Sequence, residues 1–91
     1  MPRPKLCRRI RLRIKTDYFK PRGIPMGNLE IIILTKEELE SLRLKNVENL
    51  DQSTAAQKMN TSQSTFQRIL SSAYKKVSEA LVKGKAIKID K

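Results

Sequence analysis

Two short helical patterns separated by a very tight turn, within residues 50–77, constrain the fold of this chain most strongly. In the first pattern, Ala55, Ala56 and Met59 form a short apolar face, whose paired alanines allow a second helix to cross closely. The apolar residues that recur at helical spacing in the second pattern are Phe66, Ile69, Leu70, Ala73 and Val77. This stretch therefore predicts two helices that pack against each other.

Polar residues mark where the two predicted helices begin and where the turn lies. Asp51 and Ser62 are suited to accept hydrogen bonds from the unpaired backbone N–H groups in the first turn of each helix. Asn60 lies where the first helix must end, and asparagine tolerates a left-handed backbone better than any residue except glycine. The spacing predicts a helix-turn-helix, and an ordinary helical hairpin explains the apolar positions equally well.

In a helix-turn-helix, the N-terminal end of the second helix enters the major groove of DNA. The outward residues there, which we expect to read bases, are Gln63, Ser64, Gln67 and Arg68. Glutamine can bond bidentately to adenine, arginine to guanine, and serine to several base edges. Residues of this stretch expected to contact the DNA backbone are Thr61, Ser62, Thr65, Lys75 and Lys76.

The charge of the chain indicates a polyanionic partner. Its 20 lysines and arginines outnumber 9 acidic residues, which gives a net charge of +11 in 91 residues. Residues 1–28 carry nine basic side chains and one acidic one, whereas residues 29–59 carry four basic and six acidic ones. Aromatic residues make up only 4% of the chain, which disfavours a single-strand binder built on stacked aromatic rings.

Several other classes of protein are disfavoured by the composition. A single cysteine, Cys7, and the absence of histidine exclude a Cys/His zinc site within one chain, and no cofactor is expected. No nucleophile or glycine-rich phosphate loop accompanies the carboxylates Glu37, Glu38 and Glu40, so an enzyme is not expected. The sequence has no apolar run of membrane-spanning length and no signal-peptide core, which predicts a cytoplasmic protein with no membrane partner.

The chain is predicted to form one domain in three parts. These are a basic N-terminal arm, strand and loop (1–34), a helical core (35–83) and a C-terminal strand (84–91). Within the first part, Tyr18 and Phe19 are expected to anchor the loop over Thr16–Asn28 to the core.

Arg8–Lys15 alternates between apolar and basic residues, which predicts a half-buried strand. Its basic side presents Arg9, Arg11 and Arg13, which are expected to contact DNA phosphates. The same charges would also keep an exposed edge strand from aggregating, and the two roles are compatible.

The remaining elements are predicted from shorter signals. Thr35 and Glu38 match a capping box and predict a helix over Lys36–Val47. The inner face of that helix is expected to contain Leu39, Leu42 and Val47.

Before that helix, Leu29–Leu34 predicts a second strand or an extended buried lead-in. Gly84 is expected to end the long second helix of the pair, and Ala86–Ile89 predicts a last strand. The expected partner of that strand is Arg8–Lys15, within the chain or across a dimer.

Seven blocks of sequence also carry a resemblance to a known family. In order they are MPRP, CRRI, YFKPRGIP, LTKEELESLRL, STAAQKM, TSQSTFQRIL and EALVKGKAIKI. They resemble a family of small prokaryotic proteins predicted to bind DNA, the domain of unknown function 134. The family's helix-turn-helix looks like that of region four of bacterial sigma factors. The resemblance implies that Ser62 caps the recognition helix, that Phe66 is buried, and that Gln63, Ser64 and Gln67 face bases.

Pattern, charge and resemblance predict the same molecule. We expect a mainly α fold with a winged-helix-like three-helix core and a small β element made by the N- and C-terminal strands. The expected function is sequence-specific binding of double-stranded DNA by a homodimer that regulates transcription. The alternatives are an RNA-binding or ribosome-associated basic protein, and an adaptor that docks on RNA polymerase.

Overall fold

The structure is a computed structural model and describes residues 18–90. Its α-helices over these residues are α1 (Lys36–Leu42), α2 (Gln52–Lys58) and α3 (Gln63–Lys83). Its strands are β1 (Tyr18–Phe19), β2 (Ile31–Thr35) and β3 (Ala86–Asp90). A short 3-10 turn, η1, covers Met26–Asn28, and a π-helical segment, η2, covers Arg43–Val47. The predicted mainly α fold with a small β element is confirmed.

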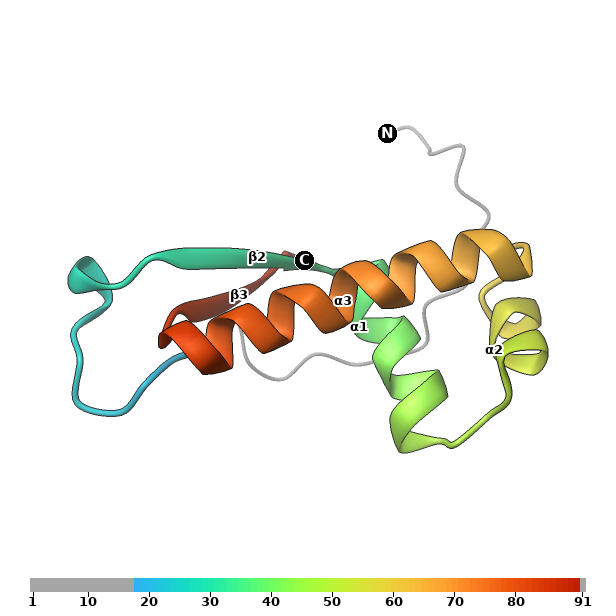
Figure 1. Cartoon of the computed structure of the whole chain (residues 1–91), viewed down its shortest axis with the longest axis horizontal. Coiled ribbons are helices and arrows are strands. Elements are labelled where there is room, and N and C mark those ends of the chain that lie inside the picture. The colour runs from blue at the N-terminus through green and yellow to red at the C-terminus, as the bar shows by residue number, and fades with distance from the viewer. Residues whose placement is uncertain (1–17, 91) are drawn as a thin grey trace.

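Helix α3 joins the two halves of the core. Figure 1 shows α2 beside the N-terminal end of α3, whereas β2 and β3 lie beside its C-terminal half. The buried cluster at the α2 end consists of Leu44, Ala55, Ala56, Met59, Phe66 and Leu70. The cluster at the sheet end consists of Leu34, Ala73 and Ile89. Because Phe66, Leu70 and Ala73 recur at helical spacing, one face of α3 contributes to both clusters.

Strand β3 is the central strand of the sheet. It pairs parallel with β2, where Leu34 lies opposite Ile89, and antiparallel with β1, where Phe19 lies opposite Ile87. The predicted strand over Ala86–Ile89 is confirmed, and its two isoleucines pack toward the core. Its expected partner, Arg8–Lys15, lies outside the described residues. Within residues 18–90, β1 and β2 lie along the two edges of β3.

The helix that follows β2 begins as predicted. Thr35 accepts a hydrogen bond from the backbone N–H of Glu38, and the Glu38 carboxylate accepts one from the backbone N–H of Thr35. The helical path also continues to Val47, but its last turn is π-helical, with the N–H of Glu48 bonded to the carbonyl of Arg43. A wider turn rotates each residue by less than an α-helix does. Val47 is therefore 73% exposed while Leu44 is buried, and the predicted inner position of Val47 is wrong.

The two aromatic residues before the first loop do not bury their rings. Tyr18 is 40% exposed and Phe19 is 57% exposed. Their backbones pair with Lys88 and Ile87 of β3, so strand pairing positions this segment. Tyr18 and Phe19 were expected to anchor the loop over Thr16–Asn28 to the core, but neither belongs to a core cluster or packs against one. They form the edge strand β1 within the predicted loop, where neighbouring elements cover them less.

Candidate nucleic-acid interface

Side-chain caps fix the starts of the two helices of the predicted helix-turn-helix. The carboxylate of Asp51 accepts a hydrogen bond of 2.7 Å from the backbone N–H of Thr54, in the first turn of α2. The hydroxyl of Ser62 accepts one of 3.1 Å from the N–H of Thr65, in the first turn of α3. Both predicted caps are confirmed, and each satisfies a donor that has no partner inside its helix.

The turn between the helices depends on a left-handed residue. Asn60 has φ +57°, as expected for an asparagine at the end of a helix. Its N–H bonds to the carbonyl of Gln57 at 2.9 Å, and the N–H of Thr61 bonds to the carbonyl of Ala56 at 3.0 Å. This pair of bonds is the Schellman arrangement, which closes α2 and redirects the chain within one turn.

The contact between α2 and α3 is made by small or flexible apolar side chains. Ala55, Ala56 and Met59 of this region are buried together with Phe66 of α3. The alanines leave room for the Phe66 ring, and the methionine fills the remaining space. Because these contacts are fully buried, α2 holds the N-terminal end of α3 in one orientation.

The four residues predicted to read bases lie together on the outer side of this end of α3. Gln63, Ser64, Gln67 and Arg68 are all exposed, whereas Phe66 and Leu70, on the opposite face, are buried. No residue within 18–90 forms a hydrogen bond or an ion pair with the Arg68 guanidinium. The arrangement therefore offers amide, hydroxyl and guanidinium groups to a partner from one rigid helix.

Among the residues predicted to contact the DNA backbone, Lys75 differs from the hydroxyl residues near the turn. Lys75 is exposed and, among residues 18–90, it has no bonded partner. The hydroxyls of Ser62 and Thr65 bond to each other at 3.0 Å as part of the cap, and Thr61 is half-buried in the turn. Among the members of this set that lie within residues 18–90, Lys75 is thus a cation available to a partner.

Lys76 has a different environment from its neighbour. Its ammonium group donates a hydrogen bond of 2.7 Å to the carbonyl of Ile33 and forms an ion pair of 2.8 Å with Glu38. These bonds direct the side chain toward β2 and α1. Because its ammonium group is already paired, the phosphate contact expected for Lys76 is disfavoured, and Lys76 is not part of the proposed interface.

Glu38 is the buried partner in this network. Burial alone would raise the pKa of its carboxyl group, but hydrogen bonds from Lys76, Ser72 and the N–H of Thr35 hold the pKa below its usual value. The carboxylate therefore stays ionised, and its hydrogen bonds link α1 to α3 and to Thr35 at the end of β2.

Ser71 belongs to the exposed face of α3 but was not among the predicted site residues. It lies one turn after Gln67, and the Gln67 amide donates a hydrogen bond of 3.0 Å to its hydroxyl. The spacing of four residues is the signal that could have identified it, since residues i and i+4 of a helix are neighbours. The predicted phosphate contacts Arg9, Arg11 and Arg13 lie outside the described residues.

Two other features bear on the predicted site. Over residues 18–90, no cluster of three or more metal-ligating side chains (histidine, cysteine or carboxylate) is present. Over the same span, no helix is both long enough and apolar enough to cross a membrane.

Known proteins are similar to this chain over its full length. The family described as "Protein of unknown function DUF134" matches residues 1–91. UPF0251 proteins of Thermoanaerobacter pseudethanolicus and Dehalococcoides mccartyi are 50% and 53% identical to it over 90 residues, which is 99% of this chain and 76% and 77% of theirs. One from Moorella thermoacetica is 49% identical, and the matched region is 60% of its length. No solved structure matches the chain.

Proposed function

This chain belongs to the DUF134 family over residues 1–91, and from its helix pair we propose that it binds double-stranded DNA in a sequence-specific manner. The names of these relatives state no activity. The proposal therefore depends on the geometry and charge of the chain itself.

The observation that carries the proposal is the set of exposed polar side chains at the N-terminal end of α3. The tight turn after α2 holds this end of α3 across the short helix. The major groove, about 12 Å wide, admits a helix presented in this way. Gln67 and Arg68 are suited to base edges, and Lys75 lies two turns further along the same helix, where a phosphate contact would add affinity. The net charge of +11 supports a polyanionic partner.

We further propose that the protein acts as a homodimer and regulates transcription in the cytoplasm. One recognition helix reads only a few base pairs, so useful specificity requires two half-sites. Pairing of β3 between two copies is disfavoured, because β1 and β2 lie along both of its edges. The dimer would therefore use another surface.

Selection of bound sequences from random duplex DNA, with structured RNA as competitor at physiological salt, tests the proposal. We expect enrichment of two related half-sites whose centres lie about 10–10.5 base pairs, or a multiple of this, apart. Equal binding to every duplex would contradict specificity. Preference for the RNA competitor would favour the RNA-binding alternative. A separate pull-down that recovers RNA polymerase in the absence of DNA would favour the alternative that the protein is an adaptor.

A further inference from the structure

A second surface lies on the outer face of the sheet, which points away from the helices. The inner face packs on α3, where Leu34 and Ile89 are buried together with Ala73. Because side chains alternate along a strand, the residues between these positions point to the outer face. The strand register brings together there Tyr18, Ile31, Ile33, Lys88 and Asp90.

The apolar residues of this outer face are exposed. Ile31 is 45% exposed, Ile33 is 43% exposed and Tyr18 is 40% exposed. Strand β2 is thus apolar at every position from Ile31 to Leu34, although only alternate positions face the core. A strand with one face in water normally alternates, whereas a continuous apolar run is typical of a parallel strand that is buried on both faces. Since β2 pairs parallel with β3, its sequence indicates that the outer face is covered in the functional protein.

Two charges make this face complementary to a copy of itself. Lys88 and Asp90 are both exposed, and they lie two positions apart on the same side of β3. Among residues 18–90, neither side chain has a hydrogen-bonding or ion-pair partner. In a twofold dimer the same surface of each copy meets itself, so Lys88 of each copy can pair with Asp90 of the other. The strand residues of this face therefore carry no net charge, in contrast to the chain as a whole.

We propose that the outer face of the sheet is the surface through which two copies of this chain associate. The two sheets would pack face to face about 10 Å apart, with Tyr18, Ile31 and Ile33 of both copies between them. The choice of a second copy rests on the homodimer proposed above. The exposed apolar face and its two charges do not depend on DNA binding.

The arrangement places the two recognition helices at a suitable distance. Each α3 packs on the inner face of its own sheet, and packed layers are spaced by roughly 10 Å, so three layer spacings separate the two helices by roughly 30 Å. Half-sites one turn of DNA apart are separated by about 34–36 Å. The N-terminal end of α3 extends beyond the sheet (Figure 1), so both polar ends would point the same way when the strands of the two copies run in the same direction.

The size of the face indicates a weak dimer. Strands β2 and β3 have five residues each and β1 has two, so the face spans roughly 17 Å along the strands and 10–15 Å across them. A stable interface buries about 800 Å² on each copy, which is more than this face supplies. We therefore expect a dissociation constant on the order of 10–100 μM without DNA, and tighter association when two half-sites hold the two copies together.

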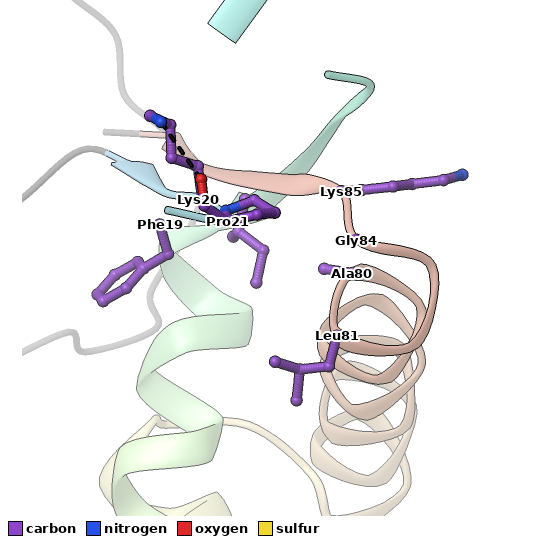
Figure 2. Close-up of a pocket in the computed structure, with 8 residues that line it drawn as sticks. Phe19, Lys20, Pro21, Ala80, Leu81, Gly84 and Lys85 are labelled. Atoms are coloured by element: carbon purple, nitrogen blue, oxygen red, sulfur yellow. Dashed lines mark hydrogen bonds between the residues drawn. The ribbon is translucent and has the colours of Figure 1, made fainter. Parts of the chain in front are cut away.

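Another exposed apolar surface supplies a control position. A groove of about 360 Å³ between β1 and the C-terminal end of α3 is lined by Phe19, Pro21, Ala80 and Leu81. Leu81 is 76% exposed, and Figure 2 shows its side chain projecting from α3. Leu81 is thus a similarly apolar and more exposed residue that does not belong to the outer face of the sheet.

Sedimentation velocity of the full chain without DNA, from about 1 to 200 μM, tests the inference. We expect the fraction of dimer to rise with concentration. Ile33→Glu should weaken the dimer by at least about ten-fold, because a charge replaces an apolar contact in the middle of the interface. Leu81→Glu is the matched control and should dimerise like the parent chain. Thermal unfolding should show that both variants remain folded.

Reversal of the two charges tests the pairing without a change in apolar packing. Lys88→Asp and Asp90→Lys should each weaken the dimer by about three-fold or more, and the double variant should restore it, because the pairs form again with exchanged partners. The proposal would be overturned by a parent chain that stays monomeric at about 200 μM, by an unchanged dimer in Ile33→Glu, by loss of the dimer in Leu81→Glu, or by a double variant no better than the single ones. A dimer formed by this face that binds no DNA would contradict the proposed function and leave this inference standing.

Discussion

The ammonium group of Lys76 lies between a buried carboxylate and a backbone carbonyl of β2. Its bond to the carbonyl of Ile33, and that of the Glu38 carboxylate to the N–H of Thr35, satisfy two backbone groups of this strand with side chains. A strand at the edge of a sheet with unpaired groups is a template for association with other strands. The Lys76–Glu38 pair therefore stabilises the domain and protects the edge of β2.

Replacing Lys76 by methionine should lower the free energy of unfolding by about 1–3 kcal/mol, because the buried carboxylate of Glu38 loses its partner. Lys75→Met is the matched control and should change the unfolding free energy by less than about 0.5 kcal/mol. Urea denaturation of both variants measures the difference. Equal stability of the two variants would contradict the structural role assigned to Lys76.

The contribution of Glu38 should depend on pH in a defined direction. Its pKa in the folded chain lies below the ordinary value of 4.5, so its stabilisation is present above that pH and is lost as the pH falls through the folded pKa. The chain should thus be more stable than the Glu38→Gln variant at pH 7, and the difference should shrink on acidification below 4.5. Thermal melts across pH 3–7 measure it. A difference that grows toward low pH would contradict the assignment.

Arg68 and Lys75 should have distinct effects on DNA binding. Arg68→Ala should weaken binding to the selected site by roughly 1–3 kcal/mol if the guanidinium contacts a guanine, and should relax preference at that base pair. Lys75→Ala should weaken binding to all sequences and reduce the salt dependence, since a phosphate contact releases counterions. Fluorescence anisotropy over a salt series measures both effects. Unchanged binding in both variants would place the DNA interface elsewhere.

At the scale of elements, asparagines with left-handed backbones end the two helical segments nearest to α3, which are α1 with η2, and α2. Asn49 has φ +59° after η2, and Asn60 has φ +57° after α2. Each allows the chain to reverse within a few residues. The tight second reversal sets the angle at which α2 supports α3, so local backbone conformation positions the proposed recognition surface.

Substitutions of Asn60 test the importance of this turn. Asn60→Gly should keep the unfolding free energy within about 1 kcal/mol, because glycine adopts positive φ without a steric cost. Asn60→Val should lower it by about 1–2 kcal/mol or more, since a β-branched residue is strained there. Chemical denaturation compares the two variants. Similar stability of valine and glycine at this position would show that the turn can relax without loss.

At the scale of the whole molecule, α3 connects two surfaces of different character. Its N-terminal end lies beside α2 and its C-terminal half beside β2 and β3 (Figure 1). The first end carries the exposed side chains of Gln67 and Arg68, and the second forms one side of a groove that Leu81 and Phe19 line. Because one continuous helix carries both surfaces, their separation is fixed by its length.

The features that the sequence determined by itself are local. The caps at Asp51 and Ser62, the left-handed Asn60 and the capping box of Thr35 each involve hydrogen bonds between residues at most five positions apart. The apolar periodicity that buries Phe66 is equally local, because a helix repeats every 3.6 residues. Such signals allowed the helix pair and its outward face to be predicted from the residues alone.

Only the tertiary structure decided the contacts between distant segments. The pairing of β2 with β3 joins residues 55 positions apart, such as Ile32 and Ile87, and the bond of Lys76 to Glu38 spans 38 positions. Two adjacent lysines, Lys75 and Lys76, look alike in sequence, but one is exposed and the other is paired. Their difference follows from which face of α3 meets the sheet, and packing of the whole chain sets that face.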